Sequence, residues 1–170
     1  MKKYNRILIL GGPGSGKTTL AKLLSEKYNL PVINLDGINY LENWIPRDKN
    51  KRDNIIINEA NKDKWIIEGI YKSTLEIRAK RADLIIILDY KTKSLIYGVL
   101  KRYFTSIGKE KEEIKGCKEK IDKEFLKYII NFNKKTRKKY MDILYKIENI
   151  NEKIIYFKNR KELNNYINKL

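Results

Sequence analysis

One eight-residue motif near the start of the chain, Gly11 to Thr18, constrains the fold more than any other feature. An apolar run, residues 7–10, leads into this motif, and a helical pattern follows it from Thr19. A glycine, four further residues and then Gly-Lys-Thr, between a strand and a helix, is the spacing of a P-loop. The sequence therefore predicts a strand, a phosphate-binding loop and a helix in succession. The residues expected around the phosphates are Gly11, Gly12, Pro13, Gly14, Ser15, Gly16, Lys17, Thr18 and Thr19.

Each residue type in the motif has its own chemical reason. Glycines let successive backbone N–H groups turn inward around phosphate oxygens, where a Cβ would clash. The helix that follows directs its positive end at the same phosphates. We expect Lys17 to neutralise the β- and γ-phosphates and the Thr18 hydroxyl to ligate Mg²⁺. ATP and Mg²⁺ are therefore the expected cofactors.

Composition limits what can surround this site. The 170 residues are enough for one well-buried domain. No apolar segment approaches the length of a membrane span and no signal-like region precedes the first strand, so we expect a soluble, cytoplasmic protein with no membrane partner. Cys117 is the only cysteine and histidine is absent. An intramolecular disulfide is thereby excluded, and proton transfer must use a carboxylate or water.

The basic charge of the chain is its one compositional signal for a polymer partner. The formal net charge is +17, and a basic surface attracts phosphate backbones without sequence recognition. The excess is mostly lysine, is spread along the chain and accompanies abundant isoleucine and asparagine, which indicates compositional bias. We therefore do not expect nucleic acid to be the partner.

Three predicted strands deliver acids to one edge of a sheet, because short apolar runs end in Asp36, Glu68 and Asp89. Ligands of open α/β sheets bind at the carboxyl ends of the strands. We expect Asp36 to orient or deprotonate an acceptor, although an Asp-Gly pair is also a common turn. Glu68 is expected at the adjacent strand end, facing the phosphates. Asp89 can hold water on Mg²⁺ or can cap the helix that follows it.

Residues 38–51 should form an irregular segment that precedes a helix over residues 52–62. Tyr40, Trp44 and Arg47 within it suit a flat ring that bears a phosphate, although a surface loop anchored by one tryptophan is equally compatible. The acceptor-side residues that we expect are Asp36, Tyr40, Trp44, Glu68, Gly69, Tyr71 and Arg78.

The second half of the chain contains a predicted lid and a long helix. Residues 105–120 are polar and lack a sustained apolar period, which favours a mobile lid. The helix expected over residues 121–147 has an apolar stripe that Asn133 and Arg137 interrupt. A guanidinium on a core-facing stripe requires an anion. That anion is either a transferring phosphoryl group or an internal carboxylate in a structural ion pair.

Five predicted strands alternate with helices, and no linker or repeat divides the chain. The last strand covers residues 153–157, and Asn159 and Glu162 have capping-box spacing for a final helix. Alternation of this kind predicts an α/β fold in which helices cover both faces of a parallel sheet. We therefore expect a single three-layer domain over residues 1–170.

Nearly the whole chain resembles the bacterial DNA topology modulation protein family, small P-loop proteins related to adenylate kinase. Beyond the P-loop, the resemblance depends on Asn34-Leu35-Asp36, Trp44, residues 65–71, Ser73-Thr74-Leu75, Arg78, Ala82-Asp83, Asp89, Gly116-Cys117, Phe125, Asn131-Phe132 and Arg137.

This resemblance implies a nucleotide-kinase-like P-loop fold with a five-stranded parallel sheet in the order 2-3-1-4-5, ATP with Mg²⁺, and a small phosphate acceptor. It also implies that Glu68 lies near the metal and that Arg102 and Arg137 are lid arginines, with catalytic roles alongside Lys17 and Asp36. The chain departs from the family pattern at Glu68, where aspartate is usual, and between residues 105 and 115, where lysine and glutamate replace arginine.

Two functions from different classes fit these features. The first is a phosphotransferase that moves the γ-phosphoryl group of ATP to a nucleotide, a nucleoside or a similar small acceptor, by positioning and charge neutralisation. The alternative is a nucleotide-binding regulatory protein that acts on DNA or on a protein partner with little turnover. The sequence contains no helix-turn-helix or other DNA-reading module, which favours the phosphotransferase.

Overall fold

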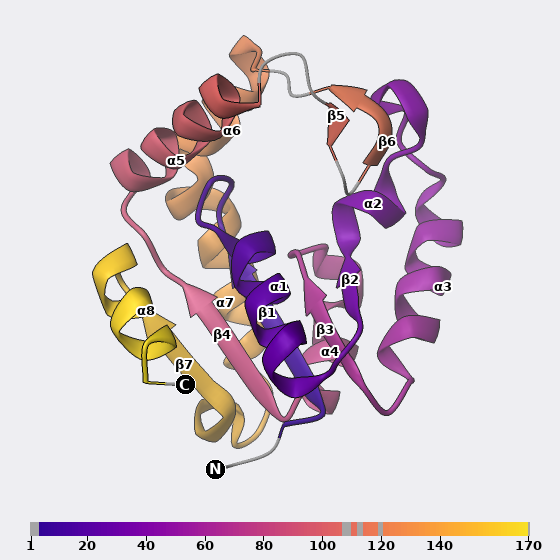
Figure 1. Cartoon of the computed structure of the whole chain (residues 1–170). Coiled ribbons are helices and arrows are strands. Elements are labelled where there is room, and N and C mark those ends of the chain that lie inside the picture. Colours follow the sequence, from indigo (N-terminus) through magenta and orange to yellow (C-terminus); the bar gives the residue numbers. More distant parts are fainter. Residues whose placement is uncertain (1–3, 107–109, 112–113, 119–120, 170) are drawn as a thin grey trace.

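The computed structural model describes residues 4–106, 110–111, 114–118 and 121–169. Its centre is a sheet of five parallel strands in the order β2-β3-β1-β4-β7 (Figure 1). Numbered along the chain among themselves, these five strands have the order 2-3-1-4-5, which confirms the predicted sheet. The strands are β1 (Arg6–Gly11), β2 (Val32–Asn34), β3 (Trp65–Glu68), β4 (Leu84–Leu88) and β7 (Ile154–Phe157).

Helices cover both faces of this sheet, as predicted. In Figure 1, α1 lies in front of the strands, and α4 and α7 lie behind them. No helix in the described residues is both long enough and apolar enough to cross a membrane. The α-helices are α1 (Lys17–Tyr28), α2 (Leu35–Asn39), α3 (Lys49–Ala60), α4 (Leu75–Arg81), α5 (Thr92–Thr105), α6 (Lys123–Asn131), α7 (Lys138–Leu144) and α8 (Arg160–Ile167). Short helical turns are η1 (Glu42–Trp44), η2 (Lys72–Thr74), η3 (Phe132–Arg137) and η4 (Ile150–Lys153).

The core follows from the two most apolar runs of the sequence. Residues 7–10 of β1 and 85–87 of β4 are completely buried, because helices cover both sides of these central strands. Each fully buried isoleucine or leucine side chain contributes about 1.5–3 kcal/mol to the free energy of unfolding. The strand register brings Gly11 beside Leu88 and Glu68 beside Asn34. The carboxyl ends of four strands therefore meet at one edge of a rigid sheet.

The prediction for residues 35–51 was wrong in two respects, and side-chain caps explain both. β2 ends at Asn34, whose Oδ1 accepts a hydrogen bond from the Gly37 N–H at 2.9 Å, so Asp36 lies in the first turn of α2 instead of at a strand end. Asp48 Oδ1 likewise accepts from the Lys51 N–H at 3.0 Å, and α3 begins at Lys49. The segment expected to be irregular therefore consists largely of α2, η1 and the first turn of α3.

The long helix expected over residues 121–147 is divided. A π-helical segment, η3, separates α6 from α7, and α7 ends at Leu144. A π turn inserts extra residues into the helical period and is frequent at functional sites. Asn133 nevertheless faces the sheet, because its Nδ2 donates to the Tyr90 carbonyl at 3.1 Å.

Part of the predicted lid forms a hairpin of β5 (Glu110–Lys111) and β6 (Ile114–Lys118). Of the other predicted lid residues, Thr105 is the last residue of α5 and Ser106 follows it, whereas residues 107–109, 112–113 and 119–120 lie outside the described residues. Cys117 of β6 is buried, and its sulfur accepts a hydrogen bond from the Trp44 N–H at 3.1 Å. The hairpin therefore lies beside α2 and η1 (Figure 1). Mobility of this lid stays a prediction.

Candidate functional site

The glycines of the P-loop meet conformational and packing demands that other residues would violate. Gly14 and Gly16 have φ values of 69° and 94°, which L side chains rarely adopt. A Cβ on Gly14 would also lie 2.6 Å from the Leu95 carbonyl oxygen and from the Val99 nitrogen of α5. The loop is therefore packed tightly against α5, with Gly16 at the N-cap position of α1.

The interior of the loop offers groups that suit a triphosphate. Ser15 is completely buried, and its hydroxyl has no hydrogen-bond partner within the described part of the chain. Such an orphan donor suits a phosphate oxygen. Lys17 Nζ donates to the Gly12 carbonyl at 3.1 Å, which keeps the ammonium at the loop. Pro13 is partly buried, and Thr19 is exposed on α1.

Thr18 and Glu68 come together at the start of α1. The Thr18 hydroxyl donates to Glu68 Oε1 at 2.7 Å, and the Asn34 side chain donates to the same carboxylate oxygen. Glu68 is only 4% exposed. A hydroxyl and a carboxylate are the hard oxygen donors that Mg²⁺ prefers, and it usually takes few protein ligands beside the phosphates. These two residues fit the predicted metal position.

Asp36 is surrounded by tyrosines from three segments. The Tyr71 hydroxyl donates to Asp36 Oδ1 at 2.9 Å, and burial, then the neighbouring Asp36 carboxylate, raise the pKa of Tyr71. Burial and then Asp36 also raise the pKa of Tyr40. For Tyr128 on α6, burial is the main cause of a raised pKa, and Asp36 adds to it. All three phenols therefore stay protonated around one exposed carboxylate.

Tyr40 and Trp44, the aromatic pair predicted for the acceptor, pack against each other, and the hairpin contacts the backbone of Trp44. The Tyr40 and Trp44 rings pack edge to face at 5.3 Å. Asn43 and Trp44 have φ values of 58° and 61°, which is a strained conformation for side chains larger than glycine. The hydrogen bond from the Trp44 N–H to Cys117 helps to maintain it. Strain of this kind often marks a ligand-binding segment.

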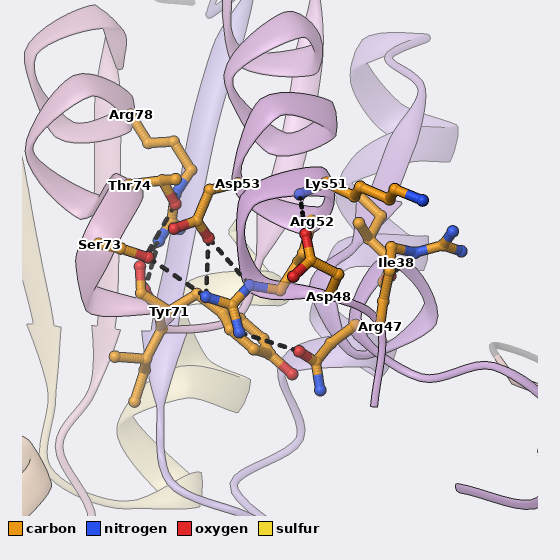
Figure 2. A network of polar contacts seen from close by, with 12 residues as sticks. Ile38, Arg47, Asp48, Lys51, Arg52, Asp53, Tyr71, Ser73, Thr74 and Arg78 are labelled. Carbon is orange, nitrogen blue, oxygen red and sulfur yellow. Dashed lines mark hydrogen bonds and ion pairs between the residues drawn. The ribbon is translucent and has the colours of Figure 1, made fainter. Parts of the chain in front are cut away.

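Arg52 packs on Tyr71, one of the residues predicted for the acceptor, and sequence reasoning missed it (Figure 2). Its Nη2 donates to Asp53 Oδ1 at 2.7 Å, and its Nη1 donates to Asn39 Oδ1 at 3.1 Å. The guanidinium lies 5.0 Å from the centre of the Tyr71 ring. Burial alone would raise the pKa of Asp53, but hydrogen bonds with Ser73 and Arg52 lower it overall. Arg52 therefore ties α2, α3 and the loop after β3 together.

Arg78 was predicted to contact the acceptor, but its side chain is completely buried. The guanidinium donates to the carbonyls of Gly69, Ile70 and Tyr71 and thereby holds the loop that follows β3. Burial lowers the pKa of Arg78 to about 9, so the side chain is still a cation at neutral pH. Gly69 and Tyr71 in this loop have φ values of 126° and 26°, an arrangement that the buried cation stabilises.

Arg137 is paired with Asp89 at the carboxyl end of β4. Its Nε donates to Asp89 Oδ1 at 2.5 Å and its Nη2 donates to Oδ2 at 2.6 Å. Hydrogen bonding to Asp89 raises the pKa of Arg137. Both oxygens of Asp89 are engaged in this pair, whereas Glu68 contacts Thr18 directly. Arg102 lies in the last turn of α5, next to the predicted lid.

A family model described as an AAA domain, AAA_17, matches residues 10–138, which is more than half of the chain. The protein belongs to the AAA_17 family. Adenylate kinase of Buchnera aphidicola subsp. Schizaphis graminum is 32% identical to this AAA_17 protein over 117 residues, 69% of this chain and 48% of that kinase. Adenylate kinase of Wigglesworthia glossinidia brevipalpis is 58% identical over 33 residues, 19% of this chain and 16% of that kinase. The chain thus spans less than half of the length of these curated relatives.

Solved structures with the same fold cover almost all of this AAA_17 protein. A gluconokinase from Sinorhizobium meliloti 1021 has a TM-score of 0.58 at 14% identity, over 99% of this chain and 90% of its own. Shikimate kinase from Bacteroides thetaiotaomicron has a TM-score of 0.56 at 19% identity, over 98% of this chain and 95% of its own. The chain therefore has the P-loop kinase fold. The finer resemblance to DNA topology modulation proteins stays a prediction.

Three further polar residues of this AAA_17 protein, Asn34, Asn39 and Arg160, join the site beside Arg52, and of these only Asn34 was among the residues that carried the family resemblance. Asn34 contacts Glu68, and Asn39 contacts Arg52. Arg160 Nη2 donates to the Gly14 carbonyl at 2.7 Å across 146 residues of sequence. Arg52 and Arg160 occur in a chain with 38 lysines and arginines. Because their partners Asn39 and Gly14 lie in other segments, nothing distinguished these two arginines from exposed basic residues.

Proposed function

We propose that this protein is an ATP-dependent phosphotransferase that moves the γ-phosphoryl group to a small acceptor, a nucleotide or a nucleoside. One observation carries the proposal. The four residues from Glu68 to Tyr71 connect both halves of the site, because Glu68 contacts Thr18 beside the P-loop and Tyr71 contacts Asp36. A donor phosphate on the P-loop and an acceptor at Asp36 would therefore be held by one short, rigid segment.

The phosphate half would act by positioning and charge neutralisation. The loop N–H groups, the orphan Ser15 hydroxyl and the Lys17 ammonium supply hydrogen-bond donors and positive charge for the triphosphate. Thr18 and Glu68 would hold Mg²⁺, which supplies further neutralisation of phosphate charge when bound. Membership in a P-loop family supports the binding of ATP.

The acceptor half would orient a hydroxyl or phosphate oxygen towards the γ-phosphoryl group. Asp36 is the exposed carboxylate, and in a chain without histidine it is the proposed group that orients the acceptor or takes its proton. The Tyr71 hydroxyl, kept protonated by its raised pKa, holds that carboxylate in place. Arg137 is proposed to leave Asp89 and to contact the transferring phosphoryl group as its charge develops.

Aromatic side chains support a planar acceptor. Tyr40, Trp44 and Tyr128 come from different segments, and Asp36 lies close enough to Tyr40 and Tyr128 to shift their pKa values. Rings of this kind stack on a nucleobase, whereas a sugar acid would require more charged and hydrogen-bonding groups.

A panel of nucleosides and nucleoside monophosphates, each added with ATP and Mg²⁺, tests the proposal by the release of ADP. One acceptor should stimulate release far above the rate of ATP hydrolysis without acceptor. Gluconate and shikimate serve as acceptors without a nucleobase. Binding of ATP with no stimulation by any acceptor would contradict the proposal and would favour a nucleotide-dependent regulatory protein.

A further inference from the structure

The first residue of the last helix reaches the P-loop from outside. α8 begins at Arg160 because Asn159 Oδ1 accepts a hydrogen bond from the Glu162 N–H at 2.9 Å. Glu162 in return accepts from the Lys158 N–H at 2.7 Å. This cap fixes where the helix begins and thereby the position of the Arg160 backbone.

Arg160 ends on one carbonyl of the P-loop. Its Nη2 donates to the Gly14 oxygen at 2.7 Å, and its guanidinium lies 5.6 Å from the centre of the Tyr90 ring. The backbone of α5 packs against the same atom. A Cβ on Gly98 would lie 2.0 Å from the Gly14 oxygen and 2.4 Å from Arg160 Nη2. Gly98 therefore leaves the space in which this contact forms.

The position of Arg160 is unfavourable for the helix itself. A cation in the first turn opposes the helix dipole, and Lys161 adds a second positive charge there. Residues that break a local rule often do so for a tertiary or functional contact. The hydrogen bond to Gly14 is such a contact, because it joins residues 146 positions apart.

Peptide geometry explains what this contact does to the phosphate site. In a trans peptide the carbonyl oxygen and the N–H of the next residue point in opposite directions. An outward Gly14 oxygen, held by Arg160, therefore turns the Ser15 N–H towards the interior of the loop. That N–H now donates to the Gly12 carbonyl at 3.2 Å, within the loop.

We propose that Arg160 is a positioning residue for the nucleotide. It holds the Gly14–Ser15 peptide so that the Ser15 N–H stays inside the loop, where this N–H exchanges the Gly12 carbonyl for a phosphate oxygen when the nucleotide binds. Gly98 gives the Arg160 guanidinium room. This inference rests on the proposed ATP site. Arg160 acts through the loop backbone and not through the nucleobase. Loss of the Arg160 side chain therefore weakens the binding of every ligand that carries the phosphate chain, whether or not a base is attached.

Binding measurements with Arg160→Met, Arg160→Lys and wild type test the proposal by titration calorimetry. The ligands are ATP and inorganic tripolyphosphate, each with Mg²⁺. Arg160→Met should lower the affinity for both ligands by about tenfold, which is the effect of losing one hydrogen bond from a charged donor. Arg160→Lys should recover part of the loss. Lys161→Met, which removes the same charge from the exposed neighbouring position, is the matched control and should bind both ligands as wild type does.

The ratio of the two affinities separates the proposal from its rivals. Equal losses for ATP and tripolyphosphate support it, and Gly98→Ala should then produce the same pattern by displacing Gly14. A loss for ATP alone would mean that Arg160 contacts the base, and unchanged affinities would mean a structural contact. Either result overturns the proposal. Failure of the wild type to bind either ligand would instead overturn the proposed function.

Discussion

The proposed phosphate-binding half of the site comes from eight consecutive residues, whereas the proposed acceptor half takes its side chains from four segments of the chain. In the P-loop, the backbone of Gly14 and Gly16 and the N-terminus of α1 form most of the site. Around Asp36, the groups are side chains from α2, α3, α6 and the loop after β3. The first half is specified locally, and the second depends on how the helices pack.

This difference has a physical cause. Backbone N–H groups occur at every position except proline, so a phosphate site needs only the right sequence of conformations, which glycine spacing supplies. An acceptor site must place particular polar and aromatic groups at particular points, and few residues in one segment can do so. Substitutions should therefore affect the two halves differently.

The largest expected effect is at Lys17, in the local half. Lys17→Ala should lower phosphoryl transfer by about a thousandfold or more, because no neutral side chain replaces its charge at the phosphates. The fold should persist, since the side chain is only partly buried. Steady-state rates and melting temperature on one preparation check this, with Lys22→Ala on the exposed side of α1 as control. Wild-type turnover in Lys17→Ala would exclude the P-loop from catalysis.

Arg137 tests whether the ion pair at β4 is catalytic or only structural. Arg137→Ala should lower kcat by roughly a hundredfold or more with little change in ATP affinity, because the guanidinium acts on charge that develops in the transition state. Arg137→Lys should not restore the rate, since an ammonium lacks the planar fork.

Asp89→Asn provides the matched comparison for Arg137, because it breaks the pair and keeps the guanidinium. It should retain most of the turnover, and Lys138→Ala, at the exposed neighbouring position, should retain all of it. If Arg137→Ala and Asp89→Asn lower the melting temperature by the same amount and both keep full turnover, Arg137 is structural.

In the dispersed half, Asp36 and Tyr71 should separate chemistry from positioning. Asp36→Asn should lower kcat by about a hundredfold, within the range for general acid–base groups, with ATP affinity nearly unchanged. Tyr71→Phe removes only the hydroxyl that orients Asp36, and should cost about tenfold or less. Single-turnover rates with saturating ATP distinguish them. Equal and small effects from both variants would show that Asp36 lies outside the chemical step.

The smallest effect concerns Asp53, which anchors Arg52. Its pKa is lowered in the folded protein, so its stabilisation is present above the unfolded pKa, near 3.8, and is lost as the pH falls through the folded value. Asp53→Asn should reduce the free energy of unfolding by about 1 kcal/mol at neutral pH, and the difference should vanish in strong acid. Urea titrations at several pH values measure it, with exposed Asp63→Asn as control. A difference that does not depend on pH would contradict the assigned ion pair.

Much of the fold was predictable because its signals are short in range. The apolar runs of β1 and β4, the glycine pattern after β1 and the cap at Asn159 each lie within a few residues. The predicted boundaries failed where side-chain caps intervened, as at Asn34 and Asp48. They also failed where a π segment broke the helical period, and the pairing of β5 with β6 was missed because these strands are polar and short.

What the sequence determined by itself was the parallel sheet, the P-loop and the placement of Glu68 and Asp89 at the carboxyl ends of β3 and β4, because strand periodicity and glycine spacing are properties of neighbouring residues. Tertiary structure alone decided how the other side chains are used. It buried Arg78 under the loop after β3, paired Arg137 with Asp89 and brought Arg52 and Arg160 to the site. The strength of a guanidinium contact depends on distance and burial, and neither quantity exists until segments far apart in the chain have packed together.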